Sequence, residues 1–336
     1  MPLIIHAVNI HQGGGRNLLR SLIDAIDCPA LLILDSRFEF FVPQKKDIDI
    51  VRFKPTILSR LKAEFYLRKF ANPNDIVLCF GNLPPLFKIS GTIFVYLQNR
   101  YLCSKCGLDG LPLRVRLRII VERLWLRFFM RDAKILVQTN TMQRQLKSYL
   151  GQEALVMPFL PEVVQSESIR FSEDKSDYLY VASGEVHKNH RALIRAWVML
   201  SEHGLRPSLR LTLDRTKEAS LVKFIDEQSR AHHLKITTES VTSEQVSHLY
   251  ANSSALIYPS LFESFGLPLL EARSFGLPII ASERDYVRDV VNPDVTFDPD
   301  SELSIARAVM RHMGIENPEV PPDTPETFLN KFIGPL

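Results

Sequence analysis

The sequence predicts an α/β fold of two doubly wound halves that face a central cleft, and three observations lead to it. Apolar runs of strand length alternate with helical patterns along most of the chain. A polar, proline-containing stretch at 158–177 interrupts this alternation and is typical of a linker. The 336 residues suffice for two domains of ordinary size, and the hydrophobic fraction of 46% supplies a core for each.

In the first half, short apolar runs predict five strands. They cover 3–10, 30–35, 75–81, 92–98 and 133–139. A glycine loop, HQGGGRN, follows the first strand and precedes a helix. A long basic helix is expected at 113–131, and 59–70 is a second basic stretch. Strands that alternate with helices pair in parallel, so each half should form a covered parallel sheet.

The second half repeats the pattern. Its predicted strands cover 178–183, 209–214, 234–238, 255–260 and 277–282, with a helix at 190–200. A further helix, LPLLEARSF, tolerates Pro268 in its first turn and is followed by Gly276 as its expected C-cap. We therefore divide the chain into an N-terminal domain (1–160), a C-terminal domain (161–315) and a tail (316–336) that could pack back on the first domain.

Composition excludes several classes of protein. A net charge of +3 and a pI near 8.6 are too mild to indicate nucleic-acid binding. The start MPLIIHAVNIH lacks a basic n-region, and no long uncharged apolar run occurs, so we expect a cytoplasmic protein.

The cysteines fit a reducing compartment. Cys28 and Cys79 lie beside or within apolar runs and are expected to be buried. Cys103 and Cys106 form a lone CxxC, which is a weak zinc signal without a second pair, so an ordinary loop is favoured.

One stretch carries the main functional signal, YPSLFESFGLPLLEARSFGLPIIAS at 258–282. Glu263 lies in a turn after a strand, and Glu271 lies in the helix that follows. Such a helix begins at the carboxyl edge of a sheet, where free N–H groups favour an anion such as a diphosphate. The two carboxylates offer acceptors for sugar hydroxyls, Glu263 for a transferred sugar and Glu271 for a ribose.

ESFGLPLLE resembles the E-x7-E motif of the retaining GT-B glycosyltransferases of the family-4 type. Upstream, YVASGEVHKNHRALIRAW is similar to that family's strand, loop and helix with a donor-phosphate lysine, here Lys188. The resemblance implies a GT-B fold of two Rossmann-like domains, with catalytic roles for Glu263 and Lys188. It also implies donor binding by Gly14, Gly15, Ser183, Lys188, Ser264, Phe265, Gly266, Leu267 and Glu271.

The sequence departs from the family pattern at two places. Ser183 stands where relatives usually carry a second phosphate-binding arginine, and His187, His190 or Arg191 could replace that charge in part. Gln98 and Asn99 occupy the place of a histidine near the reacting sugar carbon. Their neutral amides are candidate contacts for a sugar or acceptor hydroxyl.

Two other chemistries were weighed. Asp298 and Asp300 have the D-x-D spacing of metal-dependent glycosyltransferases, but helix capping is the favoured role, and the resemblance implies no metal or other cofactor. Asp35 ends the second strand as the ribose-binding acid of an NAD site would, yet Leu18 replaces the third glycine of the dinucleotide fingerprint.

The basic helix leaves two interpretations open. Its apolar residues Leu117, Ile120, Leu124 and Phe128 recur at helical spacing among arginines. Either its arginine face is solvated, as in an ordinary helix, or the helix lies on anionic lipid. The second interpretation would place the protein peripherally on the inner side of the cell membrane. Its arginines are Arg114, Arg116, Arg118, Arg123, Arg127 and Arg131.

Together these features predict a metal-independent, retaining hexosyltransferase of bacterial surface polysaccharide (O-antigen or capsule) synthesis. It would move a sugar from a nucleotide diphosphate sugar to a glycan or polyprenyl-linked glycan, and no nucleic-acid partner is expected. Two alternatives stay open at this point, a non-catalytic nucleotide-sugar-binding protein of the same fold and an NAD-dependent dehydrogenase.

Overall fold

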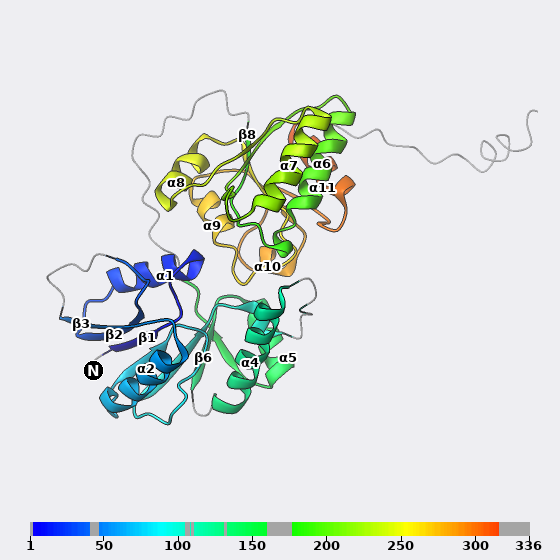
Figure 1. Ribbon diagram of the computed structural model, residues 1–336. Coiled ribbons are helices and arrows are strands. Elements are labelled where there is room, and N and C mark those ends of the chain that lie inside the picture. Colours follow the sequence, from blue (N-terminus) through cyan, green and yellow to red (C-terminus); the bar gives the residue numbers. More distant parts are fainter. Residues whose placement is uncertain are drawn as a thin grey trace, which may run out of the picture.

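The computed structural model describes residues 3–40, 47–104, 108, 111–130, 133–159 and 177–315, and these form two Rossmann-like α/β domains (Figure 1). The N-terminal sheet has the order β3-β2-β1-β4-β5-β6-β7, and the C-terminal sheet has the order β10-β9-β8-β11-β12-β13. Every described strand pair is parallel. The fold class predicted from the alternation of strands and helices is therefore confirmed.

The N-terminal domain contains more elements than the sequence predicts. Its strands are β1 (Leu3–Ala7), β2 (Ala30–Asp35), β3 (Ile48–Phe53), β4 (Ile76–Cys79), β5 (Thr92–Leu97), β6 (Lys134–Val137) and β7 (Ala154–Val156). Its helices are α1 (Gly13–Asp24), α2 (Ile57–Phe70), α3 (Arg100–Cys103), α4 (Leu113–Phe129) and α5 (Asn140–Leu150). Two edge strands were not predicted from the sequence. β3 mixes polar with apolar residues, and β7 has only three residues.

The C-terminal domain follows the predicted order with shorter strands. These are β8 (Asp177–Tyr180), β9 (Ser208–Leu211), β10 (Ile236–Thr238), β11 (Ala255–Tyr258), β12 (Ile279–Ser282) and β13 (Val295–Phe297). A 3-10 turn, η1 (Val186–Lys188), precedes α6 (His190–Glu202). The other helices are α7 (Ala219–His232), α8 (Ser243–Asn252), α9 (Leu267–Ser274), α10 (Asp285–Arg288) and α11 (Glu302–His312).

Each domain buries its own core. In the N-terminal domain α1 packs on one face of the sheet, while α2, α4 and α5 pack on the other. In the C-terminal domain one cluster gathers around Trp197, Tyr180 and Tyr258, all nearly inaccessible to solvent. Among the described residues, no helix combines the length and apolar character needed to cross a membrane.

The two domains meet through side chains that cap helix N-termini. The first N–H groups of a helix have no partner within it, so an oxygen from elsewhere can accept from them. The N–H of Arg100 in α3 donates to Oγ of Ser264 at 2.9 Å, and the N–H of Thr141 in α5 donates to Oδ2 of Asp289 at 2.8 Å. Both acceptors belong to the C-terminal domain, so the cleft is closed by hydrogen bonds that cross it.

Two expectations need correction. Gly13, Gly14 and Gly15 form the first turn of α1 rather than a loop before it. Cys28 is only half-buried, whereas Cys79 and Cys103 are buried, and burial raises the pKa of the Cys103 thiol to about 12. The boundary at 160/161, Cys106, Arg131 and the tail 316–336 lie outside the described residues.

Helix α9 ends as the sequence predicts. Gly276 has a φ of 67°, and the N–H groups of Gly276 and Leu277 donate to the carbonyls of Arg273 and Ala272 at 3.0 Å. This is the Schellman arrangement, in which a left-handed glycine closes the helix. Gly266, at the other end, also has a positive φ, of 80°, as the N-cap.

The space around these two glycines differs, so replacing each with alanine should lower the free energy of unfolding by a different amount. A Cβ at Gly276 would meet nothing within 4 Å, whereas a Cβ at Gly266 would lie 3.0 Å from Cδ1 of the buried Leu269. We expect Gly276→Ala to lower the free energy of unfolding by ~1–2 kcal/mol, the cost of a left-handed non-glycine residue. Gly266→Ala should cost ~1 kcal/mol more because of the added crowding. Urea unfolding of both variants measures the difference, and equal losses would contradict it.

Candidate active site

Lys188 and Glu263 form a largely buried ion pair at the carboxyl edge of the C-terminal sheet. β8 and β11 are adjacent parallel strands, so the segments that follow them, η1 and the loop before α9, leave the sheet at the same edge. Nζ of Lys188 lies 2.7 Å from Oε1 of Glu263, and the two side chains are 15% and 11% exposed. The structure thus brings together the two residues predicted to be catalytic, 75 positions apart in sequence.

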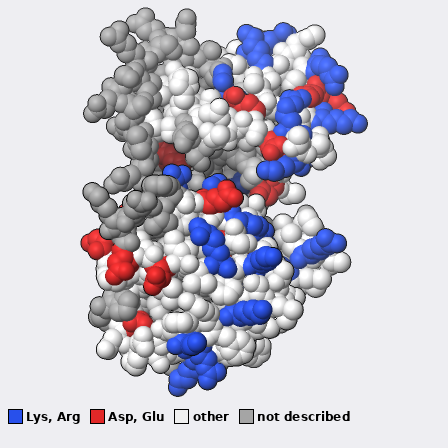
Figure 2. Space-filling model, turned by 60° about the vertical axis from the view of Figure 1, so that its left-hand side comes forward, with Lys and Arg blue, Asp and Glu red and all other residues white. Residues whose placement is uncertain are grey.

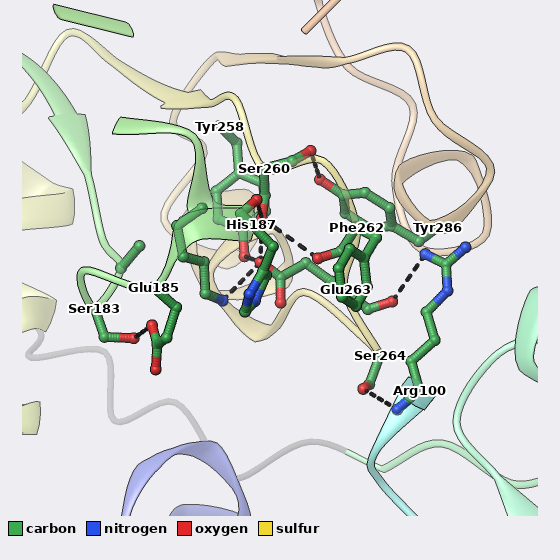
Figure 3. A network of polar contacts seen from close by, with 12 residues as sticks. Arg100, Ser183, Glu185, His187, Tyr258, Ser260, Phe262, Glu263, Ser264 and Tyr286 are labelled. Atoms are coloured by element: carbon green, nitrogen blue, oxygen red, sulfur yellow. Dashed lines mark hydrogen bonds and ion pairs between the residues drawn. The ribbon is translucent and has the colours of Figure 1, made fainter. Parts of the chain in front are cut away.

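Glu263 is held by further donors from its own loop and strand. Its Oε1 also accepts from the hydroxyls of Tyr258 at 3.1 Å and Ser260 at 2.6 Å (Figure 3). Burial, and next the Glu263 charge, raise the pKa of Tyr258 well above its usual range, so this phenol remains a donor at neutral pH. Oε2 of Glu263 makes no hydrogen bond to the residues that the structure describes, which leaves it able to accept one from a ligand hydroxyl.

The turn that carries Lys188 is fixed to the same edge. The Tyr180 hydroxyl donates to the carbonyl of Lys188 at 2.8 Å, and the Leu261 N–H donates to the carbonyl of His187 at 2.8 Å. Asn189, in a left-handed conformation with a φ of 61°, donates its side-chain amide to the carbonyl of Pro299 at 2.8 Å. The lysine is therefore presented by a rigid turn.

The start of α9 faces the glycine segment across the cleft. A Cβ added at Gly14 would lie 3.1 Å from Cδ1 of Leu267, and one at Gly15 would lie 3.2 Å from Oε1 of Gln98. A side chain at Gly14 would crowd Leu267 of the other domain, and one at Gly15 would crowd Gln98 of its own domain. The N–H groups from Ser264 to Leu267 surround this end of α9, where the helix dipole favours an anion.

Glu271 lies on α9, on the same loop-helix segment as Glu263. Its Oε2 accepts from the Tyr250 hydroxyl at 2.9 Å, and burial raises the pKa of the Glu271 carboxyl. Arg273, two residues further along the same helix, donates to the carbonyl of Asn292 and does not pair with Glu271. Glu271 thus has a neutral partner, the Tyr250 hydroxyl, and no counter-ion among the described residues.

The three side chains that could replace the missing arginine charge at Ser183 in part differ in their surroundings. The Ser183 hydroxyl donates to Oε2 of Glu185. Burial lowers the pKa of His187, and it lowers that of His190 to about 3, so His190 is neutral at physiological pH. Arg191 lies over the Phe224 ring, 4.4 Å from its centroid.

Gln98 and Asn99 sit at the cleft with their backbone fixed. Both N–H groups donate to Oδ1 of Asn82, at 2.5 and 2.9 Å. Nε2 of Gln98 donates to the carbonyl of Phe80 at 3.0 Å, and Oδ1 of Asn99 caps α3 by accepting from the Tyr101 N–H at 3.1 Å. Both amides are engaged by the protein, so each keeps only part of its bonding capacity for a ligand.

Arg100 is a residue of this region that sequence reasoning missed. Its Nη1 donates to the carbonyl of Glu263 at 3.3 Å, and its guanidinium lies 5.5 Å from the centroid of the Phe262 ring (Figure 3). The sequence offered one sign of this role, a basic residue directly after the Gln98–Asn99 pair. The fold is needed to show that Arg100 reaches the other domain.

The three aspartates considered for metal or NAD binding have partners within the protein. Ser301 caps α11, so the expectation that the aspartates cap it was wrong; Asp298 accepts from the N–H of Asp300, which pairs with Arg284. The described residues contain no cluster of acids, histidines and cysteines suited to a metal ion. Asp35 is fully buried in a 2.7 Å ion pair with Arg37.

Comparison with known proteins agrees with this geometry. Residues 164–319 match the sequence profile of the family described as Glycosyl transferases group 1. This match covers a little under half of the chain, so it shows a likeness of the C-terminal part to that family. The two facing Rossmann-like domains make the fold GT-B, since the structural neighbours are GT-B glycosyltransferases.

Relatives at the sequence level are mannosyltransferases. The chain is 30% identical over 138 residues to O-antigen chain mannosyltransferase B of Escherichia coli, covering 40% of this chain and 36% of the relative. It is 26% identical over 218 residues to O-antigen chain mannosyltransferase RfbU of Salmonella typhimurium, covering 62% of this chain and 59% of the relative. These matches therefore span well under two thirds of either relative.

A solved structure shares the whole two-domain fold. Anabaena Alr3699/HepE in complex with UDP and glucose aligns with a TM-score of 0.65 at 14% identity. The alignment covers 93% of this chain and 90% of that one. At this identity the likeness shows the fold alone.

The buried ion pair predicts strong coupling between its members. Lys188→Met or Glu263→Gln should each destabilise the protein by ~3 kcal/mol, because each leaves a buried charge without its partner. The double variant should cost less than the sum of the two, with a coupling of ~1–3 kcal/mol. Denaturant unfolding of the four proteins measures this cycle.

The exposed pair Lys147–Glu153, at 2.8 Å with side chains 65% and 75% exposed, is a matched control. Its coupling should stay below ~1 kcal/mol. Equal coupling in the two cycles would show that Lys188 and Glu263 are not paired in solution.

Proposed function

We propose that this protein is a retaining glycosyltransferase that moves a mannosyl unit from a nucleotide diphosphate sugar to a glycan acceptor in surface polysaccharide synthesis. The observation that carries the proposal is the Lys188–Glu263 pair beside the N-terminus of α9, within the residues that match the group 1 family. The choice of mannose and of O-antigen assembly is supported by the names of the relatives. The nucleotide base stays open.

The proposed roles follow from charge and hydrogen-bonding capacity. Bond cleavage at the sugar carbon places negative charge on the departing diphosphate, and Lys188 with the N–H groups near Phe265 and Gly266 would stabilise that charge. Glu263 would hold the transferred sugar through Oε2, and Glu271 would accept from the ribose hydroxyls. No metal is needed in this scheme, because Lys188 and the helix N-terminus supply the positive charge.

The two alternative functions differ in how much support they have. An NAD site lacks support, because Arg37 occupies the Asp35 carboxylate that would bind the ribose. A non-catalytic nucleotide-sugar-binding protein retains one argument: Ser183 is uncharged, and of its three possible substitutes His190 is neutral at physiological pH. Release of nucleoside diphosphate from a donor sugar would exclude it.

Donor binding is tested by thermal unfolding with UDP-, GDP- and dTDP-sugars. One nucleotide class should raise the melting temperature, since a ligand at a hundredfold excess over its Kd adds about 2.7 kcal/mol to stability. Glu271→Ala should abolish most of that shift, and the control Asp298→Ala should retain it. EDTA should change neither the shift nor the release of nucleoside diphosphate.

If no nucleotide sugar stabilises the wild type, donor binding and the proposed function fail. If Glu271→Ala responds as the wild type does, the ribose assignment fails while donor binding stands.

The second part of the proposal is a lipid-linked acceptor met at an anionic membrane surface. Helix α4 turns its apolar stripe outward: Leu117, Ile120, Leu124 and Phe128 are 45–70% exposed, while Ile119 and Leu126 face the core. At about 100° per residue the stripe is roughly 100° wide, with arginines on both flanks. Ile57, Leu58 and Phe65 of α2, which packs on the same sheet face, are also exposed.

Charge favours a membrane over a second copy of this face. The exposed basic residues of the two helices are Lys62, Arg68, Lys69, Arg114, Arg118 and Arg127. Figure 2 shows Lys and Arg side chains spread over the N-terminal domain, the lower one, with apolar or neutral surface between them. Two copies docked through this face would bring like charges together, whereas anionic lipid complements them.

Vesicle binding tests this surface. The protein should sediment with vesicles that contain phosphatidylglycerol and much less with pure phosphatidylcholine, and Arg114→Glu with Arg118→Glu should weaken binding at least ~tenfold, since each basic residue contributes about 1 kcal/mol. Leu117→Gln with Leu124→Gln should also weaken it, whereas Leu303→Gln with Met313→Gln, exposed apolar residues of the other domain, should not. Equal binding to both lipids, or a dimer abolished by the α4 changes, would reject the membrane assignment.

A further inference from the structure

Glu263 is held from both domains, although it belongs to only one. Its carboxylate is fixed within the C-terminal domain by Lys188, Tyr258 and Ser260. Its main-chain carbonyl accepts from Nη1 of Arg100, which lies in the N-terminal domain. The backbone N–H of Arg100 also donates to Oγ of the next residue, Ser264.

The Arg100 side chain is itself fixed by neighbours on both sides of the cleft. Its Nε donates to Oε1 of Gln145 at 3.2 Å within its own domain. Its guanidinium lies over the ring of Phe262, and the Tyr101 ring meets that same ring edge-on at 4.8 Å. Residues 100 and 101 thus clasp the segment 262–264 by a hydrogen bond to its backbone and by contacts to its aromatic ring.

We propose that Arg100 is a positioning residue: from the opposite domain it fixes the loop that carries Glu263, so that the active site is complete only when the cleft is closed. This deepens the proposed function and rests on it for the catalytic consequence, whereas the clasp itself is a property of the protein without ligands. Opening the cleft breaks the bonds from Arg100 and leaves the carbonyl of Glu263 and the Phe262 ring without these partners. Closing the cleft therefore also orients the carboxylate of Glu263, which would bind the sugar.

Arg144 provides a matched control. It too is an arginine of the N-terminal domain that reaches across to the C-terminal domain, where its Nη2 lies 3.8 Å from Oδ2 of Asp285. That pair is exposed, with side chains 63% and 78% accessible, and it does not touch the loop 262–264. If the loss of any contact between the domains were enough, removal of Arg100 and removal of Arg144 would have the same effect. If positioning of the loop 262–264 matters, only the removal of Arg100 would have it.

Hydrogen exchange tests the clasp without any nucleotide. Arg100→Ala should make the backbone amides of the loop 260–266 exchange at least ~fivefold faster, because the loop loses an anchor from the other domain. Arg100→Lys should restore part of the protection, since an ammonium can still donate to a carbonyl. Arg144→Ala should leave this loop unchanged. Unaltered exchange in Arg100→Ala, or equal changes in both alanine variants, would overturn the proposal.

Kinetics test the catalytic consequence with the nucleotide sugar that the thermal panel selects. Arg100→Ala should lower the kcat for donor hydrolysis by ~10- to 100-fold, the scale expected for a misplaced catalytic group. The affinity for the matching nucleoside diphosphate, measured by calorimetry, should change by less than about threefold, because that ligand binds mainly to the C-terminal domain. Equal losses of affinity and kcat would make Arg100 a direct donor ligand and overturn the positioning role.

The two proposals fail in different ways. If the wild type binds no nucleoside diphosphate, the glycosyltransferase proposal fails and the exchange experiment alone decides the clasp. If the wild type binds and hydrolyses a donor and Arg100→Ala behaves identically, only the inference about Arg100 fails.

Discussion

The site depends on one geometric constraint, that the ends of adjacent parallel strands lie at the same edge of a sheet. β8 and β11 are neighbours in the C-terminal sheet, so the turn after one and the loop after the other meet although far apart in sequence. A lysine from the first and a glutamate from the second then form an ion pair shielded from water. Removing two charges from water costs several kcal/mol per ion, so the pair persists because three donors converge on one carboxylate oxygen.

In the proposed function, the same edge would place positive charge beside a diphosphate. Helix α9 begins after Gly266; Pro268 has no N–H and the N–H of Leu269 donates to the carbonyl of Gly266, so of the first three residues only Leu267 keeps an N–H for an anion. Gly14 allows the other domain to approach this helix start closely. In the proposed function, a phosphate held there would meet the helix dipole and the Lys188 ammonium, which can stabilise the charge of a departing nucleotide.

The domain interface combines polar contacts at helix starts with the aromatic contact of Tyr101 and Phe262. Ser264 and Asp289 accept from the first N–H groups of α3 and α5, and each bond is lost when the domains separate. Such contacts are directional and individually modest, which suits a cleft that must open to admit a substrate and close again.

By itself the sequence determined the fold class, the order of most elements and the segment that carries Glu263 and Glu271, because these depend on local patterns: strand-length apolar runs, a glycine after a helix and a spacing of eight residues. It also predicted that Lys188 and Glu263 share a site, through the resemblance. It could not show that Arg100 reaches the Glu263 loop, that Arg37 occupies Asp35, or that the apolar stripe of α4 faces outward. The first depends on residues distant in sequence that become neighbours across the two domains, and the other two on how each side chain is oriented in the folded chain, which the local pattern does not give.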